Sequence, residues 1–305
     1  MSFSVLANTF ANNILPIVLL AGAGFILGKL FHIDARSLGR VVFYVFSPVL
    51  IFNLLVQNHL KLQEAIGVIA LAVCVILVIG LVTFILGSLL KLERPALTAI
   101  LITTMFSNTG NYGLPLISFA FGEQALSYAG IYFVTVTFIF YTLGVLIASL
   151  GHMSLKEALL GLFKVPTLYG VLLAILINLF HIQIPGPLNR TIELAASGTI
   201  PLMLILLGVE LTRIQFSGSI RAIQISVFLR LIIAPLIAFG FSLLFGISRP
   251  ALQASVTESA MPTIVSSTVL ATEYQLDSKL VTAIIFISTL LSPLTLTPLL
   301  VFLGR

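Results

Sequence analysis

Ten long apolar runs follow one another along this chain of 305 residues. A helix needs about 20 consecutive apolar residues to cross the hydrocarbon core of a bilayer, whereas a transmembrane barrel needs shorter strands of alternating polarity. The runs have the length of spanning helices and lack the alternation, so we predict an all-α integral membrane protein with ten transmembrane helices. They cover residues 13–30, 38–56, 65–90, 96–121, 128–150, 165–180, 194–211, 220–245, 251–271 and 280–303.

The composition agrees with a lipid environment. Charged residues make up 8% of the chain, whereas soluble domains carry roughly a quarter. The net charge of +5 comes from basic residues that flank the apolar runs, so we expect the lipid bilayer and not a nucleic acid as partner. The single cysteine, Cys74, excludes an internal disulfide. We expect no metal and no cofactor, because no metal-ligand spacing occurs among His32, His59, His152 and His181.

The basic residues between the runs are distributed unequally over the two sides of the membrane. Because cytoplasmic loops carry the excess of Lys and Arg, the richer side is predicted to face the cytoplasm and both termini to face outward. We therefore expect a multi-pass protein of the cell membrane. The richer side holds Lys29, Arg36, Arg40, Lys91, Arg94, Lys156, Lys164, Arg213, Arg221 and Lys279, and the other side holds Lys61, Arg190, Arg249 and Arg305.

Short motifs recur in the same order in the two halves of the chain. Arg-Pro-Ala-Leu occurs at 94–97 and 249–252, and Phe-His-Ile occurs at 31–33 and 180–182. Two prolines of the first half also match two of the second, Pro16 with Pro166 and Pro48 with Pro201. Chance matches in a biased composition are the alternative explanation.

We interpret the chain as a single domain, 1–305, built from two repeats, 1–150 and 151–305. Each repeat holds five helices, and because five is an odd number the second repeat must enter the membrane from the opposite side. Such an inverted repeat is a common construction of secondary transporters.

The fourth and ninth runs are interrupted near their centres. Residues 107–115 read Ser-Asn-Thr-Gly-Asn-Tyr-Gly-Leu-Pro, and residues 257–262 read Thr-Glu-Ser-Ala-Met-Pro. Glycine and proline disfavour a regular helix, and backbone groups freed at membrane depth must line a polar cavity. We expect Pro115 and Pro262 each to begin a second half-helix, whose N-terminal N–H groups favour an anion. Two proline kinks satisfied by neighbouring helices are the alternative.

The motif Asn-Thr-Gly-Asn-Tyr-Gly-Leu-Pro at 108–115, the Met261-Pro262 pair and the five-plus-five layout resemble the auxin efflux carrier family, which includes bacterial malate and malonate permeases. The resemblance implies a fold similar to that of bile-acid sodium symporters, with broken helices four and nine crossing at the site and a transport half that moves against a scaffold half. The long cytoplasmic loop of the plant members is absent, which favours a prokaryotic metabolite carrier of the inner membrane.

We therefore predict a secondary transporter that moves a small organic anion by alternating access. The substrate class is a carboxylate such as malate, malonate or an auxin-like acid, bound by amide, hydroxyl and backbone donors at the two interruptions. A homodimer is among the expected assemblies. The predicted substrate-binding residues are Asn108, Gly110, Asn111, Gly113, Pro115, Ser259, Pro262 and Arg230.

Two charges lie well away from the ends of the predicted spans, where they are costly and usually functional. Arg230 is expected to pair with Glu258 or to bind the substrate carboxylate, with snorkelling toward the interface as the alternative. Glu258 is expected to couple transport to H⁺ or Na⁺, with a structural ion pair as the alternative. We interpret Glu210, at the cytoplasmic end of the seventh run, as interfacial, with a role in gating as the alternative.

Other functions are weaker alternatives. An anion channel or a uniporter is the first alternative, but a channel needs a continuous pore, and an inverted repeat with a central break fits alternating access better. An intramembrane enzyme would need a buried nucleophile and base, which no histidine or cysteine supplies beside Ser107 or Ser259. Small-residue spacing at Gly22, Gly24 and Gly28 predicts close helix packing and no binding site.

Overall fold

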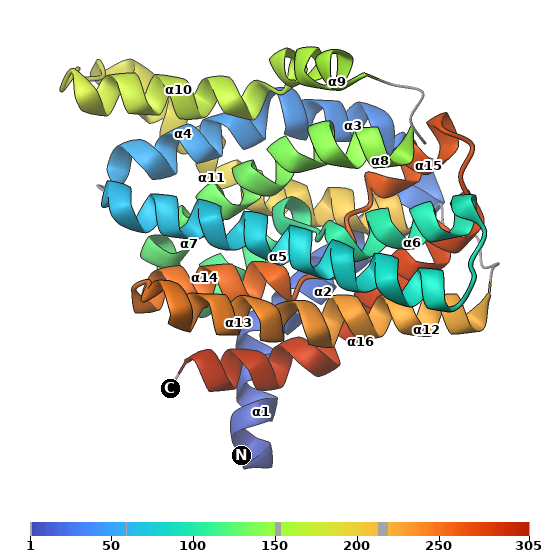
Figure 1. Cartoon of the computed structure of the whole chain (residues 1–305). Coiled ribbons are helices and arrows are strands. Elements are labelled where there is room, and N and C mark those ends of the chain that lie inside the picture. Colours follow the sequence, from blue (N-terminus) through green and yellow to red (C-terminus); the bar gives the residue numbers. More distant parts are fainter. Residues whose placement is uncertain (1, 59, 150–153, 213–218, 305) are drawn as a thin grey trace.

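The structure is a computed structural model that describes residues 2–58, 60–149, 154–212 and 219–304 (Figure 1). Within these ranges the chain is built from helices and short connections, so the predicted all-α class is confirmed. The predicted loop residues His59, His152, Arg213 and Arg305 lie outside them. Seven continuous helices are long and apolar enough to span a membrane: Phe3–Phe31, Ala35–Gln57, Leu62–Leu89, Thr109–Ala148, Gly186–Leu211, Ile220–Phe245 and Ser278–Leu303.

Four of these continuous helices contain one or two π turns, which divide them into labelled segments. The segments in chain order are α1 (Phe3–Thr9), η1 (Phe10–Ile14), α2 (Leu15–Phe31), α3 (Ala35–Val41), η2 (Val42–Phe46), α4 (Ser47–Gln57), α5 (Leu62–Leu89), α6 (Arg94–Met105), η3 (Thr109–Gly113), α7 (Leu114–Ile139), η4 (Phe140–Gly144), α8 (Val145–Ala148), α9 (Leu155–Gly161), η5 (Leu162–Lys164), α10 (Pro166–Leu179), α11 (Gly186–Leu211), α12 (Ile220–Phe228), η6 (Leu229–Ile233), α13 (Ala234–Phe245), α14 (Arg249–Ser259), α15 (Ser267–Glu273) and α16 (Ser278–Leu303).

Two helix boundaries differ from the apolar runs for identifiable reasons. α11 begins at Gly186, eight residues before the predicted run at 194, because the polar residues Asn189, Arg190 and Glu193 break the apolar pattern without breaking the helix. The fourth and fifth runs meet at Gly122, whose φ of 75° turns the chain inside α7. Glycine adopts this left-handed region without steric cost.

The helices pack in two groups. The first bundle consists of α2, α4, α10 and α11, and the second consists of α5, α6, α7, α13, α14 and α16. In Figure 1 the helices α10 and α4 lie together at the top of the view, and α13 runs below α5. The bundles touch where α11 meets η3 and α4 meets α7.

Glycines let α2 and α11 approach closely within the first bundle. A Cβ at Gly24 would overlap the backbone of Ile205, and one at Gly208 would overlap the backbone of Ala21. A Cβ at Gly22 would meet nothing within 4 Å. The predicted close packing is therefore right for Gly24 and wrong for Gly22, because positions two residues apart along a helix of about 3.6 residues per turn lie on nearly opposite faces.

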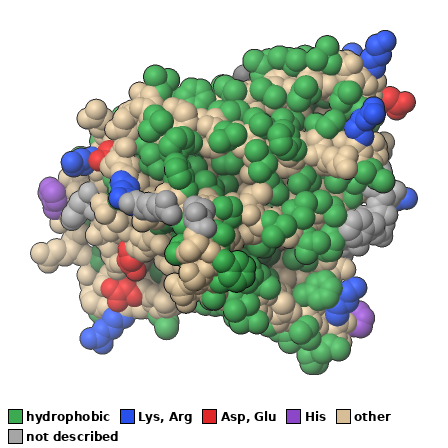
Figure 2. Space-filling model, turned by 90° about the horizontal axis from the view of Figure 1, so that it is seen from below, with side chains coloured by type: hydrophobic (Ala, Val, Ile, Leu, Met, Phe, Trp, Pro, Cys, Tyr) green, Lys and Arg blue, Asp and Glu red, His purple; other side chains and the backbone are tan. Residues whose placement is uncertain are grey.

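The outer surface is suited to lipid. Figure 2 shows one face on which apolar side chains fill the centre, while charged side chains gather toward opposite edges. Large apolar side chains are exposed on helices of both bundles, among them Leu172, Leu236 and Leu294. A band of this kind belongs in hydrocarbon, since soluble proteins rarely expose such large apolar patches.

The recurring motifs have matching local structure. His32 and His181 both take a left-handed backbone, with φ of 52° and 50°, at the ends of α2 and α10. The Arg-Pro tetrads begin α6 at Arg94 and α14 at Arg249, each with proline in the first turn. Proline is favoured there because the first helical N–H groups have no intrahelical acceptor.

Candidate functional site

The fourth predicted span is interrupted after α6. This helix ends at Met105, Asn108 has a non-helical backbone with φ −78° and ψ 64°, and η3 restarts the helix at Thr109. Pro115 comes only in the first turn of α7, when the second half-helix has already begun, so its predicted role as the starting residue is wrong. Asn108 takes that place, and its side chain makes no capping hydrogen bond.

The ninth predicted span is interrupted after α14. This helix ends at Ser259, residues 260–266 are non-helical, and α15 begins at Ser267. Pro262 therefore lies within the break and does not begin the second half-helix, which corrects the prediction. Proline drives the residue before it away from the helical region, so the Met261-Pro262 pair prolongs the break.

The two breaks are hydrogen-bonded to each other. The N–H of Asn108 donates to the carbonyl oxygen of Pro262 at 2.7 Å, and the N–H of Ile264 donates to the carbonyl oxygen of Phe106 at 3.1 Å. These bonds form an antiparallel bridge between Ser107 and Thr263. Backbone groups that the broken helices leave unpaired thus satisfy one another, as they must at a depth where water is scarce.

Arg230 joins the C-terminal ends of the two half-helices. Its guanidinium donates to the carbonyl oxygen of Thr104 at 2.8 Å, near the end of α6, and to the carbonyl oxygen of Ser259, at the end of α14. The side chain is 1% exposed and lies in the π turn η6. A guanidinium at two helix C-termini interacts favourably with both helix dipoles and donates hydrogen bonds to carbonyls that lack an intrahelical donor.

The predicted pair between Arg230 and Glu258 is not formed. Neither carboxylate oxygen of Glu258 has a hydrogen-bonding partner among the residues that the structure describes, although the side chain is fully buried. The carboxylate packs instead against Gly113, where an added Cβ would overlap its oxygens. Glu258 therefore lies beside the start of the second half-helix, where N–H groups and the helix dipole favour a negative charge.

A cavity of about 500 Å³, here called the inner cavity, reaches the first break. Asn108, Gly110 and Asn111 line it from the break, and Ile264 and Val265 line it from the ninth span. The side chain of Asn108 is 3% exposed, and its amide nitrogen has no partner among the described residues. Amide donors and a helix N-terminus thus face a space of small-molecule size.

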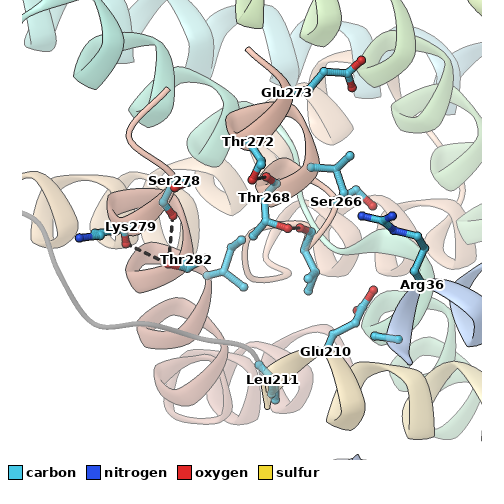
Figure 3. Close-up of a pocket in the computed structure, with 14 residues that line it drawn as sticks. Arg36, Glu210, Leu211, Ser266, Thr268, Thr272, Glu273, Ser278, Lys279 and Thr282 are labelled. Atoms are coloured by element: carbon cyan, nitrogen blue, oxygen red, sulfur yellow. Dashed lines mark hydrogen bonds between the residues drawn. The ribbon is translucent and has the colours of Figure 1, made fainter. Parts of the chain in front are cut away.

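A second cavity, of about 620 Å³, adjoins the inner cavity and is here called the vestibule. Arg36 on α3 and Glu210 on α11 point into it, and Glu273 on α15 lies across from them (Figure 3). Both cavities share Arg36 and Glu210. The sequence analysis placed these two residues at the membrane interface, because only the packing of α3 against α11 brings them to the cavities.

Other predicted site residues lie away from this space. Ser259 is fully buried, and its hydroxyl donates to the carbonyl oxygen of Val256. Neither Ser259 nor Arg230 lines the inner cavity or the vestibule. Gly113 touches Glu258 behind the cavity wall. The predicted residues thus fall into two groups: those that line the inner cavity, and those that lie near the two breaks but outside the cavities.

An apolar cluster, here called the seal, extends from the two breaks along α16. The vestibule residues Lys279 and Ile285 come early in this helix, whereas the seal residues Leu296 and Leu300 come late. From Ile285 to Leu296 the helix rises about 16 Å. The seal joins both bundles and consists of Ile14, Ile17, Tyr112, Leu116, Leu204, Leu207, Ala260, Met261, Leu296 and Leu300.

Comparison with known proteins assigns the family. The family model described as membrane transport protein matches residues 9–158 and 150–300. The chain belongs to this family. Because this is the family of the auxin efflux carriers, the resemblance of the motif at 108–115 is confirmed.

Two relatives in the membrane transport protein family are similar over nearly their full length. An uncharacterized transporter of Methanocaldococcus jannaschii is 29% identical over 302 residues, which cover 93% of this chain and 94% of the relative. An uncharacterized transporter of Methanothermobacter thermautotrophicus is 29% identical over 289 residues, with the same coverage. Family, relatives and apolar helices together identify a multi-pass membrane transporter.

Proposed function

We propose that this transporter is a secondary carrier that moves a small organic anion by alternating access, with its substrate site where the two breaks meet. The observation that carries the proposal is the bridge between Ser107 and Thr263 beside a cavity that both broken spans line. Paired interruptions in corresponding helices are typical of transport sites near the middle of the membrane.

The proposed topology is a ten-span inverted repeat with five spans in each half. α6 and α14 correspond in it, since both begin at an Arg-Pro tetrad, both end at a break and both direct C-terminal carbonyls at Arg230. Lys91 and Gly246 add a further match, because each takes a left-handed backbone three residues before its tetrad. The two stretches matched by the family model meet near residue 150, where the proposed halves meet.

The proposed anion lies with its carboxylate toward Asn108 and Asn111. Amide hydrogens and the N-terminal N–H groups of η3 are donors that suit a carboxylate, and they need no bound cation to hold it. Malate, malonate and auxin-like acids fit the size of the inner cavity. Aromatic side chains on its wall, Phe133 and Tyr141 among them, offer an apolar surface to the remainder of the molecule.

The structure fits an inward-open state in this proposal. The vestibule lies at the end of the molecule that holds Arg36 and Lys279, which the charge distribution between spans assigns to the cytoplasm. The seal closes the opposite end. A channel needs a continuous pore, so a seal on one side of the site favours a carrier.

Glu258 is the proposed coupling residue. A fully buried carboxylate without a hydrogen-bonding partner among the described residues is costly as an anion, and binding H⁺ or Na⁺ removes that cost. Its contact with Gly113 joins it to the half-helix that carries the substrate donors. Cation binding and anion binding would then stabilise each other through one short segment.

The test is uptake of radiolabelled malonate into liposomes that contain the purified protein. Asn111→Ala should raise the half-saturating concentration roughly tenfold or more, because a hydrogen bond to a charged group contributes about 1.5–3 kcal/mol. Asn189→Ala, near the surface of α11, is the matched control and should leave uptake unchanged. Wild-type uptake that rises linearly with malonate would contradict a carrier, and an unchanged half-saturating concentration in Asn111→Ala would contradict the site.

A further inference from the structure

The side chain of Glu210 lies where the vestibule and the inner cavity adjoin, a place here called the neck. Glu210 lines both cavities, together with Arg36, Val265, Ser266 and Val269. The amide nitrogen of Asn111 donates to Oε2 of Glu210 at 3.4 Å. A donor of the break thus already contacts a carboxylate.

We propose that Glu210 is a specificity-determining residue whose carboxylate competes with the carboxylate of the substrate for the Asn111 amide. The inference rests on the proposed function, because it takes Asn111 to be a substrate ligand. An entering anion must then displace Glu210, and the bond that it gains at Asn111 replaces one that the empty protein already makes.

The geometry of the bond suits a contact that is exchanged. At 3.4 Å it exceeds the roughly 2.7–3.2 Å that is usual for N–H···O bonds, so little is lost when a substrate replaces it. The bond also crosses from α11 in the first bundle to η3, which leads into the second. Asn111 and Glu210 therefore lie on segments of different bundles, and the two can separate without the unfolding of a helix.

The charged side chains around the neck determine which anions can compete with Glu210 for the Asn111 amide. Arg36 and Arg40 on α3 bring positive charge to the inner cavity, whereas Glu273 on α15 and Lys279 on α16 lie at the vestibule. An anion that passes Glu210 meets like charge at close range, which weakens its binding. Glu210 thus lowers the affinity for anions and limits the site to those that form further bonds beyond Asn111.

The test is the dissociation constant of malonate, measured by calorimetry on the purified full chain. Glu210→Ala should bind malonate about threefold to tenfold more tightly, which is the effect of removing one modest competing hydrogen bond. Glu193→Gln, which changes an exposed carboxylate on α11 that lines neither cavity, should differ by less than about twofold. In an Asn111→Ala background, Glu210→Ala should have a much smaller effect, because the contested donor is absent.

The outcomes separate this inference from the proposed function. Equal malonate affinity in wild type and Glu210→Ala would leave the carboxylate site intact and overturn the competition. Weaker binding by Glu210→Ala would overturn it too, and would indicate that Glu210 receives an ammonium or hydroxyl group of the substrate. If malonate binds neither protein, the proposed site fails and the inference fails with it. A thermal unfolding curve of Glu210→Ala that matches wild type ensures that the comparison is between folded proteins.

Discussion

The backbone N–H of Asn108 donates a hydrogen bond to the carbonyl oxygen of Pro262, with 2.7 Å between nitrogen and oxygen. The two residues lie in opposite halves of the chain, and each belongs to a span that stops being helical there. Because the bond uses only backbone atoms, substitution of the Asn108 side chain would leave it in place. The contact between the two breaks therefore does not depend on the side chain of residue 108.

The first prediction concerns Arg230 as the group that joins two helix ends. Arg230→Met should lower the free energy of unfolding by about 3 kcal/mol or more, because at least two buried carbonyls lose their donor. Thermal unfolding in detergent measures this. Arg221→Met, on exposed surface earlier in the same span, should change stability little.

Uptake distinguishes the structural role from direct substrate binding at Arg230. If Arg230→Met unfolds at the wild-type temperature and yet loses transport, the residue binds substrate and the structural account is wrong. Arg230→Lys keeps the charge with fewer directed donors, so we expect intermediate stability.

The second prediction concerns the close approach of α2 and α11. Gly24→Ala and Gly208→Ala should each lower stability by about 1–3 kcal/mol, because the new methyl group would overlap backbone that cannot move alone. Gly22→Ala is the control on the same helix, and with open space around it should be neutral or slightly stabilising. Equal unfolding temperatures for all three variants would show that these helices do not pack as described.

The third prediction tests the contact between Gly113 and Glu258. Gly113→Ala should be destabilising because the methyl group overlaps the carboxylate, whereas Gly240→Ala on α13 meets open space and should be tolerated. If this contact is the cause, Gly113→Ala should lower the free energy of unfolding much less in a Glu258→Ala background. A double-mutant cycle of unfolding free energies measures the difference. Additive losses would mean that the two residues act independently.

The fourth prediction concerns access to the site from the two sides of the membrane. In a Cys74→Ser background, a cysteine at Ser266 should react with a membrane-impermeant thiol reagent applied from the cytoplasmic side, because Ser266 lines both cavities. A cysteine at Leu300, in the seal, should be protected from both sides. Labelling of Ser266→Cys only from the outer side would reverse the proposed orientation.

The sequence alone determined that this is a helical membrane protein and indicated where two non-helical segments fall. Apolar run length is a local property, so it predicted a helical membrane protein without any knowledge of packing. Glycine and proline act on their own backbone, so the breaks after Met105 and after Ser259 were also predictable. The residues at which the helices restart were not predictable in this way, because Pro115 falls after the helix has already restarted and Pro262 lies within its break.

Only the tertiary structure decided which side chains surround the site. Arg230 was predicted to pair with Glu258 or to bind the substrate carboxylate, but two helix ends present unpaired carbonyls to it, and the N–H donors of its guanidinium satisfy these acceptors. Glu210 and Arg36 line the cavities because α11 and α3 pack against each other. Contacts of this kind join residues far apart in the chain, and their free energy depends on packing that no local sequence pattern encodes.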